Sequence, residues 1–80
     1  MKARVFVNLK PGVHDPQGET IRRALQTLGY QGIAEVRQGK FFELSVAAAS
    51  RAEAEATLGE IAERVLSNPV IESFRIELES

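Results

Sequence analysis

The sequence predicts one α+β domain with the element order β-α-β-β-α-β, built over residues 1–80. Two observations carry this prediction. Several short stretches alternate apolar and polar residues, the two-residue period of a strand that has one face on a core. Between them lie two longer stretches with apolar residues at i, i+3, i+4 and i+7, the period of an amphipathic helix. We therefore expect strands and helices to segregate into two layers.

Residues 3–9 form the first expected strand. Ala3, Val5 and Val7 point to one side, with polar residues between them. Phe6 is the exception, because it places an aromatic ring on the otherwise polar side. This pattern predicts a strand whose apolar side lies on the core.

The next stretch predicts a turn followed by a helix over residues 16–28. Pro11-Gly12 is typical of a turn, and Asp15-Pro16 is typical of a helix N-cap followed by the first helical position. Gly18 weakens a helix by roughly 1 kcal/mol, so either another segment packs against its backbone or a first-turn glycine is simply tolerated. Gly29 is well placed to end the helix. The apolar stripe consists of Ile21, Ala24, Leu25 and Leu28.

Residues 33–38 and 41–48 read as two strands. Gly39-Lys40 lies between them, and a glycine at the first central position suits a type II′ hairpin turn. Phe42 and Leu44 share one side of the second strand, whereas Ala34 and Val36 share one side of the first. We therefore expect a tight hairpin at Gly39-Lys40.

A second helix and a last strand complete the order. Ser50 and Glu53 form a capping box at the start of the helix. Asn68-Pro69 ends it, because the residue before proline is disfavoured in the helical region. Residues 70–78 then alternate once more as a strand.

This order is the ferredoxin-like split arrangement: a two-layer sandwich with an antiparallel four-stranded sheet and both helices on one face. The other face would carry Phe6, Phe41 and Ile71. Several large apolar residues on a bare sheet face favour self-association by sheet packing. The alternative is that these side chains are scattered singly and need no partner.

Composition excludes several classes of protein. The net charge is −1, and the pI of about 5.8 argues against a nucleic-acid-binding protein. No apolar run approaches the roughly 20 residues of a membrane span, and the first residues enter a strand pattern without a signal-peptide core. The chain has no Cys, so disulfides do not supplement its small core, and oligomerisation is the remaining common aid. We expect a cytoplasmic protein.

Catalytic chemistry is sparse in this sequence. His14 is the only histidine, and a metal site needs more ligands than one His and scattered carboxylates supply. There is no phosphate-binding loop, and the loop after the first strand lacks the Arg of an acylphosphatase. We predict no catalytic, cofactor-binding or metal-binding residue on this chain, which favours a subunit or a binding module.

Several motifs, in order along the whole chain, resemble those of the PurS family, the small subunit of phosphoribosylformylglycinamidine synthase. The resemblance rests on D-P-Q-G at residues 15–18, R-x-G-K at residues 37–40 and N-P-V-I-E at residues 68–72. Only the alanines at 47–49 depart from the polar strand end expected there.

The resemblance implies a non-catalytic bridging subunit in purine biosynthesis. Such a subunit associates with itself as a dimer or larger oligomer. It also binds the PurL synthetase and the PurQ glutaminase, and it supports the transfer of ammonia between these two partners. The complex uses ATP and Mg, with no cofactor on this chain. Basic residues near the loops and the hairpin end are then candidates for partner docking, with ordinary surface charge as the alternative; they are Lys10, His14, Arg37 and Lys40.

Two other functions stay open on the residues alone. An ACT-like regulatory module shares the element order and binds an amino acid at a dimer interface, near a Gly-rich loop that Pro11-Gly12 matches poorly. A stand-alone enzyme using His14 is the weaker alternative, because no nucleophile lies near it in the sequence.

Overall fold

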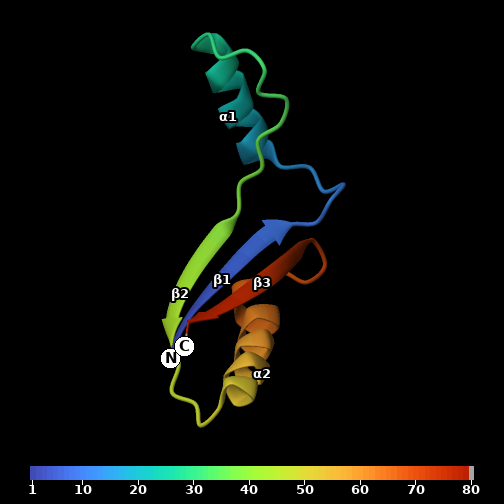
Figure 1. The fold of residues 1–80 in the computed structure, drawn as a ribbon. Coiled ribbons are helices and arrows are strands. Elements are labelled where there is room, and N and C mark those ends of the chain that lie inside the picture. Colours follow the sequence, from blue (N-terminus) through green and yellow to red (C-terminus); the bar gives the residue numbers. More distant parts are fainter. Residues whose placement is uncertain (80) are drawn as a thin grey trace.

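The computed structural model describes residues 1–79, so Ser80, the last residue of the expected domain, lies outside the described part. Figure 1 shows the elements in chain order. They are β1 (Lys2–Leu9), α1 (Pro16–Thr27), β2 (Lys40–Ser45), α2 (Arg51–Ile61), the π-helical turn η1 (Ala62–Leu66) and β3 (Glu72–Glu79).

The strands form a three-stranded antiparallel sheet in the order β2-β1-β3. Val5 of β1 lies opposite Phe42 of β2 on one side and Ile76 of β3 on the other. β1 is therefore the central strand, and its odd-numbered residues lie on the face that α2 covers. The α+β class is confirmed, whereas the four-stranded detail is not.

The core lies between the sheet and α2. Its fully buried apolar residues come from β1, α2 and η1 and are Ala3, Val5, Val7, Ala54, Leu58 and Ala62. Three of the six are alanines, so the helix approaches the sheet closely. Half-buried Phe42, Leu44 and Ile76 complete the layer from the neighbouring strands, and Leu66 from η1.

The predicted helix ends are confirmed. The Asp15 side chain caps α1 with Pro16 in its first turn, and the Ser50 hydroxyl accepts from Glu53 N at the start of α2. The Glu53 carboxylate accepts from Ala49 N at 3.3 Å. In the usual capping box this carboxylate accepts from the N–H of the N-cap residue, which here is Ser50, so the bond is made one residue earlier. Gly29 follows α1 with a φ of 98°, as expected for a left-handed helix end.

The strand predicted at residues 33–38 and the hairpin at Gly39-Lys40 are both wrong. Gly39 does not have the positive φ that a type II′ turn requires, and Figure 1 shows the chain running from this segment straight on into β2. Side-chain parity supplies the reason. A two-residue turn would place residue 37 beside residue 42 on the core face, which sets Arg37 against Phe42. In the straight chain, Val36, Phe42 and Leu44 are all even-numbered, so their side chains lie on the same face of the extended segment.

The prediction that both helices cover the sheet is also wrong. Figure 1 shows α2 against the sheet, whereas α1 stands beyond the end of it. The molecule measures 51 × 26 × 15 Å, and its radius of gyration is 16.1 Å. A compact chain of this length has a radius of gyration of about 12 Å. We call residues 16–35 the arm, and the two segments that join it to the sheet, residues 10–15 and 36–39, the neck.

Candidate functional site: the neck and the uncovered faces

The Asp15 carboxylate ties the two segments of the neck together. Its Oδ1 accepts from Gly18 N at 2.8 Å, and its Oδ2 accepts from Gln38 N at 2.7 Å. Asp15 is the one buried charged residue among residues 1–79. The N–H of Gly18, then that of Gln38, lowers the pKa of Asp15 against the opposing effect of burial, and the charge of Arg37 adds to the lowering. The carboxylate is therefore held in its charged form.

The Arg37 guanidinium makes a second tie across the neck. Its Nη1 donates to Val13 O at 2.7 Å, and its Nη2 donates to Lys10 O at 3.2 Å. The same two segments are thus joined by a side chain that accepts hydrogen bonds, Asp15, and by one that donates them, Arg37. The neck is thus a crosslinked pair of chains, which fixes the direction in which the arm leaves the sheet.

Two glycines allow close backbone approaches at the neck, Gly18 of α1 against Val36 and Gly39 against β1. A Cβ on Gly18 would lie 2.0 Å from the carbonyl oxygen of Val36, so only glycine fits. This resolves the two explanations for a glycine in the first turn of α1 in favour of close packing. A Cβ on Gly39 would lie 2.4 Å from Asn8 Oδ1 and 2.7 Å from Val7 O. The D-P-Q-G and R-x-G-K motifs therefore meet here and share one geometric role.

The structure brings the predicted docking residues to the same end of the sheet, and three of the four bind their own chain. Lys10 Nζ donates to Pro69 O at 2.7 Å, Lys40 Nζ lies 3.3 Å from the Glu72 carboxylate, and Arg37 serves the neck. Asn68 N, and after it Lys40, lowers the pKa of Glu72. His14 is exposed. Docking of a partner on these residues stays a prediction.

The predicted self-association face carries an aromatic pair. The rings of Phe6 and Phe41 are 5.0 Å apart between centroids, and the Arg75 guanidinium lies 4.3 Å above the Phe6 ring. Ile71 is not on a strand but in the turn before β3, 39% exposed. The rest of this face is polar or charged, with Arg75 paired to Glu77. The apolar part of the open face is thus smaller than the sequence predicts.

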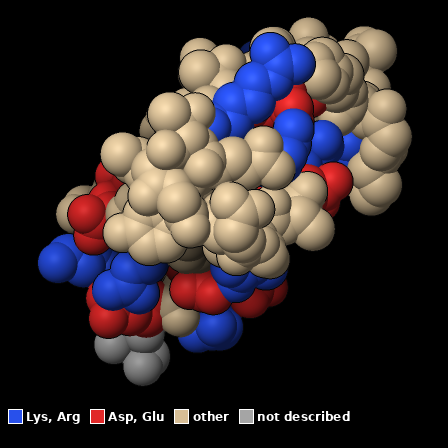
Figure 2. Space-filling model, turned by 90° about the horizontal axis from the view of Figure 1, so that it is seen from above, with Lys and Arg blue, Asp and Glu red and all other residues tan. Residues whose placement is uncertain are grey.

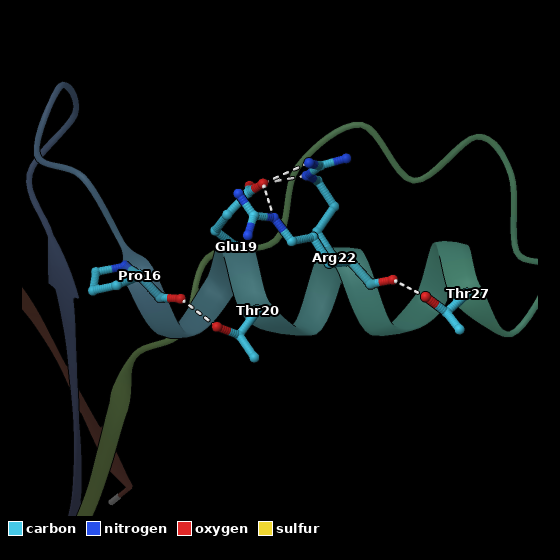
Figure 3. Close-up of polar contacts among 6 residues, drawn as sticks. Pro16, Glu19, Thr20, Arg22 and Thr27 are labelled. Atoms are coloured by element: carbon cyan, nitrogen blue, oxygen red, sulfur yellow. Dashed lines mark hydrogen bonds and ion pairs between the residues drawn. The ribbon is translucent and has the colours of Figure 1, made fainter.

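The polar side of α1 is held by its own charges (Figure 3). The Arg22 guanidinium binds Glu19 through two atoms, at 2.5 and 2.9 Å, and Arg23 Nε lies 3.2 Å from the same carboxylate. The Arg22 hydrogen bond lowers the pKa of Glu19 to about 2. Thr20 and Thr27 donate to the carbonyls of Pro16 and Arg23 at 2.9 and 3.1 Å. The i, i+3 and i, i+4 spacings would have predicted this cluster.

Beyond these contacts, we searched the described residues for a metal site, a membrane-spanning helix and a pocket. Among residues 1–79, no three or more His, Cys, Asp or Glu side chains are grouped in a way that would hold a metal ion. No helix in that part of the chain combines the length and the apolar character needed to cross a membrane. An open pocket of about 300 Å³ lies between the neck and Glu72, with Asp15 and Lys40 in its wall.

The neck predicts how stability depends on acidity. The folded pKa of Asp15 lies below its usual value of 3.8. The contribution of Asp15 to the free energy of unfolding is therefore complete above about pH 4. It is lost as the pH falls through the lower pKa that Asp15 has in the folded state. We expect Asp15→Asn to lower the denaturant midpoint at pH 7 and to shrink its fall between about pH 4 and pH 2. Denaturant titration at several pH values measures both effects.

Glu63→Gln removes an exposed carboxylate from η1 and is the matched control. It should leave the acid dependence of the wild-type chain in place. If Asp15→Asn keeps the full acid dependence as well, Asp15 does not hold the neck.

Comparison with protein families identifies one over nearly the whole chain. Residues 2–80 match the family model described as PurS, phosphoribosylformylglycinamidine (FGAM) synthase. The FGAM synthase subunit PurS of Archaeoglobus fulgidus is 42% identical over 95% of this chain and 95% of its own.

Solved structures agree with the sequence comparison. Bacillus subtilis PurS has a TM-score of 0.90 at 38% identity, covering 99% of this chain and 98% of that one. A chain in the structure of PurLQS from Thermotoga maritima has a TM-score of 0.87 at 32% identity, covering 95% and 93%. Agreement over so much of both chains includes α1, so the detached arm is a shared feature of these folds.

Proposed function

The chain belongs to the PurS family of FGAM synthase subunits, and on that premise we propose that it is the non-catalytic subunit that links the PurQ glutaminase to the PurL synthetase. In this assembly, formylglycinamide ribonucleotide, ATP, glutamine and water yield formylglycinamidine ribonucleotide, ADP, phosphate and glutamate. PurQ releases ammonia and PurL consumes it with ATP and Mg. The present chain holds the two together and supports the transfer, in the cytoplasm where these metabolites are used.

The similarity to a chain of the PurLQS structure carries this proposal, because it extends over 95% of the present chain. The residues supply the second argument. The most distinctive motifs build the neck with backbone contacts, a structural and not a chemical use. The family match also favours this function over the ACT-like module.

Reconstitution of the synthase tests the proposal. We expect omission of the chain to lower glutamine-dependent FGAM synthesis at least tenfold, while synthesis from added ammonium salt persists. The two substrates differ only in whether ammonia must travel from one subunit to the other. Unchanged glutamine-dependent activity would refute the bridging role. Equal loss of both activities would refute the non-catalytic role, because the chain would then be needed for the synthetase step itself.

Self-association through the open sheet face is part of the proposed function. We expect Phe6→Glu to raise the dissociation constant of the contact between these faces at least tenfold, because a carboxylate would replace the ring that packs on Phe41. Light scattering over a dilution series measures the change, and circular dichroism checks the fold. Ala52→Glu, on the exposed side of α2, is the control. An unchanged assembly in both variants would eliminate this face.

A further inference from the structure

We propose that the outer edge of β3 pairs antiparallel with the same edge of a second copy, about a two-fold axis at Ile76. The two sheets then join into one continuous sheet with the strand order β2-β1-β3-β3-β1-β2. This contact lies at the edge of the sheet and is separate from the contact between open faces described above. It goes beyond the proposed function and does not depend on the link to PurL or PurQ.

The outer edge of β3 has no neighbouring strand among residues 1–79. The strand order β2-β1-β3 makes β3 an edge strand, and Figure 1 shows it on the side of β1 away from β2. Its eight residues, Glu72–Glu79, include no Pro and no Lys, the residues that most often protect a sheet edge from pairing. A regular edge strand of this length therefore offers a row of backbone groups to another strand.

The hydrogen-bond pattern shows which backbone groups of β3 face outward. Lys10 N donates to Ile71 O at 2.8 Å. Hydrogen-bonded pairs alternate along an antiparallel ladder, so the odd-numbered residues of β3 are the ones that bond to β1. The N–H and C=O groups of Phe74, Ile76 and Leu78 therefore point away from β1. No turn, loop or cap bond of the described chain uses these groups, so a second strand can bond to them without breaking an existing contact.

The same three residues form an apolar row that its own chain covers only in part. Their side chains lie on the α2 face, opposite fully buried residues of β1. Phe74 is nevertheless 37% exposed, and Ile76 and Leu78 are only half-buried. With the axis at Ile76, Phe74 of each copy lies opposite Leu78 of the other. The apolar layer then continues from one sheet into the next.

Charge selects both this register and a second copy as the partner. On the open face Arg75 and Glu77 flank Ile76 and bind each other, with side chains 61% and 46% exposed. An axis at Ile76 places Arg75 of each copy opposite Glu77 of the other, and opposite charges facing one another across strands stabilise a sheet. An axis one residue away would instead place Arg75 opposite Arg75, or Glu77 opposite Glu77. The edge is thus complementary to itself in this register.

The geometry of Arg75 favours these cross-strand pairs. Its guanidinium lies 4.3 Å above the Phe6 ring, which holds the charge on the open face beside the edge. Residues 75 and 77 would form non-hydrogen-bonded pairs of the new ladder, the positions at which opposite side chains lie closest. Each Glu77 would then lie near an arginine of its own copy and an arginine of the other.

The distribution of charge over the molecule also suits a self-complementary contact. Figure 2, seen from the α1 end, shows Lys and Arg side chains next to Asp and Glu side chains, beside a broad surface without charge. The net charge of the chain is −1. A surface that mixes both signs in this way attracts neither a polyanion nor a polycation strongly, whereas a second copy carries the matching charges.

Charge reversal tests the contact and its register together. We expect Arg75→Glu alone and Glu77→Arg alone each to raise the dissociation constant of the edge contact about tenfold or more, because like charges would then face one another in both pairs. An equimolar mixture of the two variants should recover about the affinity of the wild-type chain, because both pairs of a mixed dimer again have opposite charges. Sedimentation over a dilution series measures the masses. Mixing would not rescue variants that had failed to fold.

Glu43→Arg is the matched control for charge reversal. Glu43 is exposed on the same open face but belongs to β2, on the far side of β1 from the β3 edge. This variant should keep the mass of the wild-type chain. Unchanged assembly in both β3 variants, no recovery on mixing, or an equal loss in Glu43→Arg would each overturn the pairing.

Paired cysteines test the register directly, because the chain has no Cys. Opposite residues of a non-hydrogen-bonded pair have Cα atoms about 4.5 Å apart, within the range that a disulfide bridges. We expect Arg75→Cys mixed with Glu77→Cys to form covalent dimers about tenfold faster than either variant alone, because two copies of the same variant would hold their cysteines diagonally, about 7–8 Å apart. Equal rates in the mixture and in the separate variants would overturn the axis at Ile76.

Discussion

Gly18→Ala is expected to destabilise the chain by about 3 kcal/mol or more. The new methyl group would lie 2.0 Å from the carbonyl oxygen of Val36 and 2.9 Å from the carbonyl carbon. A backbone carbonyl cannot rotate away as the end of a flexible side chain does, so the first turn of α1 and the segment at Val36 must separate. Overpacking of this kind costs about 1–3 kcal/mol and sometimes more, and the Asp15 hydrogen bond to Gln38 N would be strained as well. Urea denaturation measures the loss.

Gly59→Ala is the matched control for this prediction. Gly59 also lies within a helix, but a Cβ there meets nothing within 4 Å. We expect a gain of about 0.5–1 kcal/mol, because alanine favours the helix over glycine. A loss at Gly59 equal to the loss at Gly18 would mean that helical glycines matter in general and that the neck contact does not.

Leu58→Ala is expected to destabilise the chain by about 2–5 kcal/mol. Leu58 is fully buried and is the largest of the fully buried side chains. The other buried residues of α2 and η1 are alanines, so no neighbour on the helix can fill the cavity. Domains are stable by about 5–15 kcal/mol in all, and a small core leaves this chain near the low end. Thermal and urea unfolding should both show the loss.

Thr57→Ala serves as the control for the core prediction. It shortens a side chain on the exposed side of the same helix, one residue away. We expect a change within about 0.5 kcal/mol. If the two substitutions had equal effects, α2 would not be packed on the sheet through Leu58.

The two variants separate two structural roles. Leu58 holds α2 on the sheet, so its loss should weaken the whole folded unit. Gly18 holds the arm in its direction, so its loss should also disturb any assembly that depends on the arm.

Local pattern determined most of the elements. The alternation around Val5 predicts β1, and the structure has it at Lys2–Leu9. Asp15-Pro16 and Ser50 predict the helix starts because a cap satisfies backbone groups within the same few residues. The last strand is also found, at Glu72–Glu79, and it begins two residues later than predicted. The absence of Cys and the family motifs are equally readable in the sequence.

Tertiary structure alone decided the path between α1 and β2. A glycine at position 39 is compatible with a tight turn and with an extended chain, and the residues beside it in the sequence do not distinguish between these two conformations. Asp15 and Arg37 decide, by bonding across more than twenty positions of sequence to hold the segment straight. The position of α1 follows from the same ties. Periodicity shows that its apolar stripe must be covered, but not by which sheet, because that depends on the direction in which the neck points the arm.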